Sequence, residues 1–184
     1  TPLVEAIRAA GLPEGVALRR VPHHDHTLTG SRLAVEVPPA APASGMHVEI
    51  ARRIAASGLP EGARTRALAI YRLLAEAEAK VHGVPVDEVH FHELSYADIL
   101  AAAWLIDRLN PVSWSTAPLP LGRGRVRTAH GSLPVPAPAT ALLLEGLPVA
   151  DDGIGGERVT PTGAAIIRHL APATAPAAGR IAAS

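Results

Sequence analysis

Apolar and polar residues follow two different periods along the chain. Apolar residues recur at helical spacing in several stretches, which is typical of helices with one buried face. This pattern predicts helices at residues 1–10, 46–57, 60–82, 95–109, 138–145 and 160–169. Apolar and polar residues alternate in other stretches, which predicts half-buried strands at residues 16–21, 33–37 and 112–117.

Because helices and strands are interspersed, we expect an α/β fold, with α+β as the alternative. The expected architecture is a single domain at residues 1–171, with a mixed sheet and flanking helices, and the pattern leaves the strand order open. Residues 172–184 contain mostly Ala, Pro and Gly, so we expect a disordered tail there.

Composition narrows the chemistry. Hydrophobic residues make up 48% of the chain but aromatic residues only 3%, so the core must consist of small, closely packed aliphatic side chains. Lys and Arg number 17, as do Asp and Glu, and this balance gives no electrostatic reason to bind nucleic acid or an anionic membrane. There is no cysteine, so a metal site must use imidazole, carboxylate or backbone oxygen, which suits Ni, Zn, Mn or Mg. With no long apolar run and no signal-peptide pattern, we expect a cytoplasmic protein.

The segment His90-Phe-His-Glu93 is the first candidate site. On an extended strand His90 and His92 point to one face while Phe91 points to the core, and such a pair commonly presents two metal ligands. Glu93 would then be a further ligand, an acceptor that orients an imidazole, or a general base. The alternative is that both histidines only satisfy backbone groups at the end of a strand.

Asp98 follows closely and has two interpretations. Ser95-Tyr-Ala-Asp98 has the form of a capping arrangement at the start of a helix, which explains Asp98 structurally. The same helix start would place free N–H groups beside the histidines, where an anionic ligand would be favoured.

Two further segments are candidates for binding an anion. Gly122 and Gly124 allow a ligand to approach the main chain, and Arg123, Arg125 and Arg127 match phosphate or carboxylate, although a charged, solvated edge strand explains the arginines equally well.

Thr160 reads as an N-cap before Pro161. Thr162 and Gly163 follow with amides that would hold an anion, and a cap does not explain glycine in a first helical turn.

The remaining histidines are less informative. His23, His24 and His26 form either a metal-binding tract or a solvated turn, and His47 stands at the start of a helix with no role assigned. His82 and His169 fall in the last turns of helices, where a partly charged imidazole is favoured, and we do not interpret them as ligands.

Four longer motifs resemble the LarC-type family of nickel-insertion proteins, formerly a domain-of-unknown-function family. They are AEAEAKVHGVPVDEVHFHE at residues 75–93, PLPLG at 118–122, AHGSLPVPAPAT at 129–140 and VTPTGAA at 159–165. These motifs occur in the family's order and spacing, and the resemblance covers roughly residues 1–170.

The resemblance implies nickel insertion into pyridinium-3,5-bisthiocarboxylate mononucleotide, to make the nickel pincer cofactor of lactate racemase-type enzymes. If active, the chain would be a nickel chelatase, a lyase of the cyclometallase type. The implied metal ligands are His90, His92 and Glu93, and the implied catalytic residues are Glu93, Asp98 and His130. The residues expected to bind the anionic mononucleotide substrate are Gly122, Arg123, Gly124, Thr160, Thr162 and Gly163.

The sequence also departs from the family. It lacks the usual N-terminal strand with a Ser-Gly-Ile-Ser-Gly-Asp-Met segment, and it has Ser44-Gly-Met-His47 where the family has a His-rich tract. It also lacks the C-terminal domain to which the family's CTP binding, with Mg or Mn, is attributed. We therefore expect a separate C-terminal segment or a homo-oligomer to complete the site. The alternative is a non-catalytic, LarC-like metal- or nucleotide-binding subunit.

Overall fold

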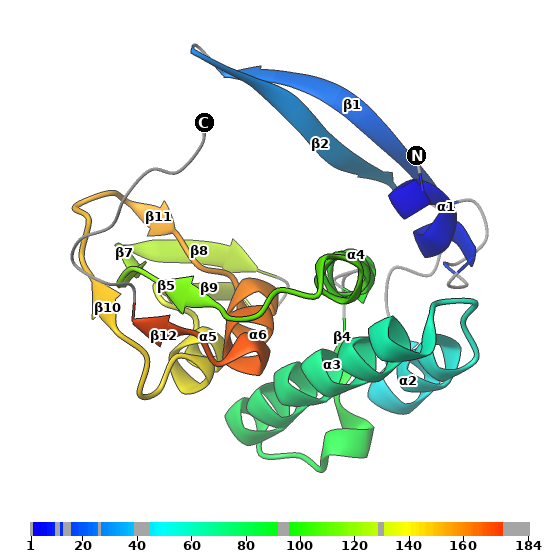
Figure 1. The fold of residues 1–184 in the computed structure, drawn as a ribbon. Coiled ribbons are helices and arrows are strands. Elements are labelled where there is room, and N and C mark those ends of the chain that lie inside the picture. Colours follow the sequence, from blue (N-terminus) through cyan, green and yellow to red (C-terminus); the bar gives the residue numbers. More distant parts are fainter. Residues whose placement is uncertain are drawn as a thin grey trace. The chain divides into compact units, whose positions relative to one another are not determined.

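The computed structural model describes residues 2–9, 12, 16–25, 27–38, 45–91, 96–128 and 131–174. The chain divides into two compact units, Thr1–Asn110 and Pro111–Ser184, and Figure 1 labels most of their elements. Among the described residues, no helix is both long and apolar enough to cross a bilayer.

The first unit is built around the long helix α3 (Glu61–His82). Helix α3 packs against α2 (His47–Ala55) and α4 (Tyr96–Leu109), and α1 (Pro2–Ala9) packs on α4. At its C-terminus Gly83 adopts a φ of 67°, which allows its amide to bond the Ala79 carbonyl and close the helix. A short 3₁₀ helix, η1 (Val86–Glu88), follows. The helices predicted in this part of the sequence are confirmed.

Small aliphatic side chains form most of the core of this unit, as the composition predicted. Those that are fully buried on α3 and α4 are Ala63, Ala67, Ile70, Ala75, Ile99, Leu100 and Ala103. The exception is a group of buried aromatic residues, Tyr71, Phe91 and Tyr96.

A two-stranded antiparallel ribbon extends from α1 in the first unit (Figure 1). Strands β1 (Ala17–Asp25) and β2 (Leu28–Glu36) pair along their whole length, and Leu18 at the base is fully buried. The two predicted strands are confirmed but are longer than expected. The turn expected around His23 and His24 is wrong, because cross-strand pairing continues through both residues and leaves them exposed.

The second unit combines short strands with two helices. Strand β10 (Val149–Ala150) pairs parallel with β6 (Leu119–Pro120), and β12 (Ala173–Thr174) pairs parallel with β5 (Ser115–Thr116). Strands β7 (Gly122–Arg123) and β11 (Gly156–Glu157) are antiparallel, as are β8 (Arg125–Thr128) and β9 (Gly131–Pro134). Helix α5 (Pro138–Leu143) packs on α6 (Pro161–Leu170).

The α/β class is confirmed, with both parallel and antiparallel pairing. Within the described ranges, however, the strands pair two by two in six small sheets and do not form one continuous sheet. The tail predicted to be disordered from residue 172 lies outside the described residues from 175 onward, whereas Ala173 and Thr174 belong to β12. The strand predicted at 112–117 is limited to Ser115–Thr116.

Candidate functional site

The histidine-bearing segment is held by a short antiparallel ladder. Strand β4 (His90–Phe91) pairs with β3 (Gly45–Met46), so that Met46 lies opposite His90. The ladder continues one residue further, because the amide of His47 donates to the Val89 carbonyl at 2.9 Å. Two segments far apart in sequence, residues 45–47 and 89–91, therefore lie side by side.

The two faces of this ladder differ in exposure. His90 is exposed, whereas Phe91 is only 8% exposed. This confirms that His90 and Phe91 point to opposite faces, as strand alternation predicted. His92 and Glu93 lie outside the described residues, so their shared face and their role remain predictions.

An aromatic stack lies on the buried face. The ring of Tyr71 lies 5.0 Å from the ring of His47 and 5.0 Å from that of Phe91, with interplanar angles of 26° and 41°. Tyr71 is fully buried, and Tyr96, the first residue of α4, is 2% exposed and close enough to act on Tyr71 electrostatically. We call His47, Tyr71, Phe91 and Tyr96 the aromatic cluster. It contains both tyrosines and the single phenylalanine of the chain.

The environment of the aromatic cluster favours neutral side chains. Burial raises the pKa of the Tyr71 hydroxyl, and the nearby Tyr96 raises it further. Burial also raises the pKa of Tyr96, against the opposing influence of Arg53. For His47 burial lowers the pKa, which Asp87 opposes. Among the described residues, the Nδ1 atom of His47 and the Tyr71 hydroxyl have no hydrogen-bond partner.

The lowered pKa of His47 makes stability depend on pH. Because an ordinary histidine has a pKa of 6.5, the stabilising contribution of neutral His47 is present above that value and is lost as pH falls through the lower folded value. As pH falls, we expect the free energy of unfolding of wild type to decrease relative to that of His47→Phe, which keeps a ring but cannot titrate. Urea denaturation of both proteins at about pH 7.5 and about pH 5.5 measures this difference. An identical gap at both pH values would contradict it.

Asp98 lies in the first turn of α4, where the sequence placed it. Partial burial raises the pKa of its carboxyl, although the residue still reaches solvent. Ser95, its expected capping partner, lies outside the described residues, so the cap itself remains a prediction.

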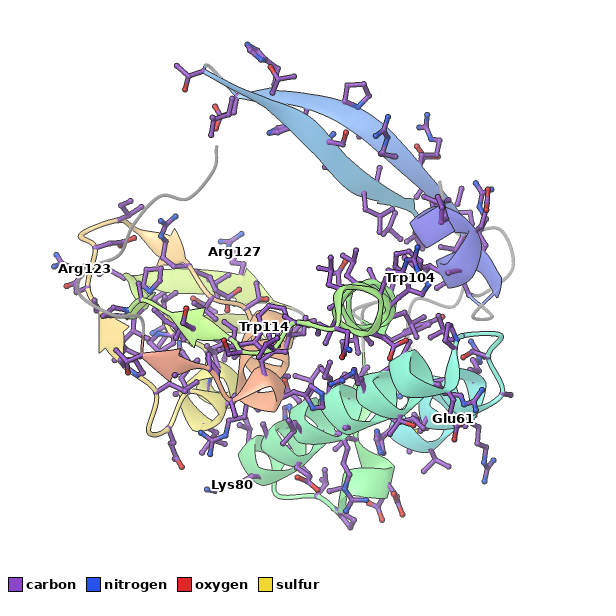
Figure 2. All side chains as sticks on the ribbon, in the orientation of Figure 1. Glu61, Lys80, Trp104, Trp114, Arg123 and Arg127 are labelled. Carbon is purple, nitrogen blue, oxygen red and sulfur yellow. The ribbon has the colours of Figure 1, made fainter. Side chains whose placement is uncertain are left out.

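In the second unit, two of the three arginines already have partners. Arg123 forms a bidentate ion pair with Asp151, with Nε–O distances of 2.8 and 3.0 Å, and this pairing lowers the pKa of the Asp151 carboxyl. Arg125 donates through Nε to the Ser132 hydroxyl at 2.9 Å. Figure 2 shows Arg123 and Arg127 reaching outward, and Arg127 forms no ion pair with any described residue. Arg123 would have to release Asp151 before it could hold an anion.

The glycines of this loop have different environments. A Cβ on Gly122 would lie 2.0 Å from the Gly156 carbonyl oxygen, because β7 and β11 approach closely there, and its φ is +76°. Gly124 also has a positive φ, +97°, but a Cβ there would meet nothing within 4 Å. The close approach of β11 therefore explains why position 122 is glycine, while the open space at Gly124 leaves room for a ligand.

Helix α6 begins as predicted. The Thr160 hydroxyl accepts a hydrogen bond from the Gly163 amide at 3.1 Å, which confirms the N-cap before Pro161. The same bond uses the amide of Gly163, one of the groups predicted to hold an anion. Thr162 is partly buried in the first turn, and His130 lies outside the described residues.

The sequence did not point to the aromatic cluster. Its four residues come from α2, α3, β4 and α4, so no local pattern joins them, and the only available signal was the scarcity of aromatic residues. Within the described ranges, no group of three or more His, Asp or Glu side chains is placed to hold a metal ion.

Comparison with known proteins agrees with the motifs. A profile of the family described as Nickel insertion protein matches residues 1–183. A protein of Citrifermentans bemidjiense is 47% identical, with 91% of this chain and 45% of that protein aligned. One of Geobacter sulfurreducens is 45% identical, with 94% of this chain and 49% of that protein covered. One of Thermomicrobium roseum is 48% identical, with 82% and 38% covered. Each is named for nickel insertion.

This chain thus spans about half the length of the curated relatives that it matches. No solved structure matches it significantly. The family match extends over nearly all residues and includes the His90 strand, β7 and the start of α6. The chain therefore belongs to the nickel insertion protein family.

Proposed function

We propose that this chain carries the nickel-binding half of a nickel insertion protein and presents His90 and His92 as ligands to Ni²⁺, which is the substrate. The observation that carries the proposal is the exposed position of His90 on a strand whose other face is fixed in a buried core. Membership of the nickel insertion family supports nickel as the metal. Imidazole and carboxylate are donors that suit Ni²⁺, and the chain offers no thiolate.

The acceptor in this proposal is pyridinium-3,5-bisthiocarboxylate mononucleotide, which becomes the nickel pincer cofactor of lactate racemase-type enzymes. Formation of a carbon–nickel bond at a ring carbon releases the proton of that carbon, so the site needs a proton acceptor. Glu93 is the carboxylate nearest in sequence to the histidines and takes that role, or ligates the metal. Asp98 and His130 are the other candidates for proton transfer.

The second unit would hold the anionic mononucleotide. Its candidates are the loop Gly122-Arg-Gly124 and the start of α6, with Thr160, Thr162 and Gly163. Arg127 is exposed and has no ion-pair partner among the described residues, so it supplies positive charge more readily than Arg123, which is paired with Asp151.

CTP, with Mg or Mn, would act through a C-terminal segment or a partner. We place the complete assembly in the cytoplasm, with no role for nucleic acid or a membrane.

Equilibrium dialysis against nickel tests the proposal. We expect His90→Ala/His92→Ala to weaken nickel binding at least about tenfold, because both proposed imidazole ligands are removed. The matched control is His23→Ala/His24→Ala, which removes two exposed histidines from the ribbon and should bind like wild type. Equal binding by wild type and the His90/His92 variant would show that nickel binds elsewhere.

The alternative function is a non-catalytic metal- or nucleotide-binding subunit, which the absence of a His-rich tract before His47 favours. The two functions differ in an insertion assay that contains CTP, Mg²⁺ and the thiolated mononucleotide. Nickel binding at His90 without product formation, even after a longer family member's C-terminal half is added, would support the alternative.

A further inference from the structure

On β4 the exposed residue His90 is held in place by the packing of its buried neighbour Phe91. His90 and Phe91 are consecutive residues on a strand, so the direction of one side chain sets the direction of the other. The Phe91 ring is buried against Tyr71, while His90 faces solvent. The contact that holds Phe91 against α3 therefore also sets the face of the strand on which His90 lies.

Tyr71 makes that connection through two ring contacts. Its fully buried ring contacts the rings of both His47 and Phe91, with a centroid separation of 5.0 Å in each case. His47 is joined to the same strand by its backbone, through the bond to the Val89 carbonyl. The Tyr71 ring thus contacts Phe91 of β4 and His47, the residue that follows β3, and it belongs to α3, the longest helix of the described residues.

We propose that Tyr71 is the positioning residue of the nickel site, because its ring clamps His47 and Phe91 and thereby sets the direction of His90. This inference rests on the proposed function of His90. Offset and tilted ring contacts at this separation favour one relative arrangement beyond simple burial. A site whose ligands must meet one geometry depends on such support from the residues behind it.

The position of His47 excludes a direct partnership with His90 on this ladder. Its backbone lies opposite Val89, one residue from the Met46–His90 pair, so its side chain belongs to the face of Phe91. The ring contact with Tyr71 agrees with this placement. His47 therefore acts through its ring contact, and a phenyl ring should replace it.

Nickel titration of purified variants, with the nickel ion alone as probe, tests the positioning role. We expect Tyr71→Leu to weaken nickel binding about tenfold, and Tyr71→Phe, which keeps the clamping ring, to bind like wild type. Nickel X-ray absorption should report fewer coordinated imidazoles for Tyr71→Leu. The matched control is Ile70→Ala, also fully buried on α3, which should lose stability but keep its nickel affinity below its unfolding temperature.

Each outcome decides the matter. If Tyr71→Leu binds nickel as Ile70→Ala does, Tyr71 is only a core residue and the inference is overturned. A loss of affinity in His47→Phe would make His47 a metal ligand, which also overturns it. If Tyr71→Leu does not fold, His47→Leu removes the other side of the clamp at a less buried position, and wild-type affinity there would overturn the inference. If His90→Ala binds nickel as tightly as wild type, the proposed function of His90 is wrong, and the positioning inference falls with it.

Discussion

Gly122→Ala should destabilise the second unit by about 3–5 kcal/mol. The new methyl group would lie 2.0 Å from the Gly156 carbonyl oxygen, which belongs to the backbone of β11 and cannot rotate away. The residue would also keep a φ of +76°, a conformation that L side chains rarely adopt. Both effects act on the β7–β11 pair, so we expect that pair to separate before the rest of the unit unfolds.

Fluorescence of Trp114 in a Trp104→Phe background measures this effect, because Trp114 is the tryptophan of the second unit (Figure 2). Gly153→Ala is the matched control, since Gly153 has the same φ of +76° but open space around its Cβ position. It should cost only about 1–2 kcal/mol. If both variants lose the same stability, the close approach at Gly122 is relieved by a small shift of β11.

The same glycine shows what sequence reasoning cannot separate. Gly122 and Gly124 look equivalent in the sequence, as two glycines that free the backbone for a ligand. In the structure one is required by a neighbouring strand that lies far along the chain, and the other is not. Such a difference depends on which strands pair, and this pairing is not a local property of the sequence.

Local features were predicted well for a physical reason. Helix α3, its Gly83 cap and the Thr160 cap depend on residues within a few positions of each other, so their signals are visible in the sequence. The opposite faces of His90 and Phe91 also follow from alternation along one strand. The ribbon was underestimated because its outer half has no buried face, and hydrophobic alternation therefore fades there.

Non-local features were missed. The β3–β4 ladder joins Met46 to His90, and the aromatic cluster draws its rings from four separate elements. His47 could be noticed in the sequence but not assigned, because its role depends on Tyr71 and Val89. The predicted metal ligand His92 and the catalytic candidates Glu93 and His130 lie outside the described residues, so the sequence and the family resemblance remain their whole support.

Ile99→Ala should cost the first unit about 2–5 kcal/mol. Ile99 is fully buried on α4, in a core where few large side chains are available to move into the space it leaves. Small alanines such as Ala67 and Ala103 already line this core and cannot extend to fill a cavity. The cost should therefore lie toward the upper end of that range, since a site that cannot collapse retains its cavity.

Denaturation followed by Trp104 on α4, in a Trp114→Phe background, measures the loss at Ile99. Ile99→Val is the graded control and should cost about 0.5–1.5 kcal/mol, because it removes only one methyl group. If Ile99→Ala costs no more than Ile99→Val, the core relaxes more easily than its composition implies. That outcome would also weaken the positioning role of Tyr71, since a core whose side chains move to fill a cavity cannot hold His90 in one direction.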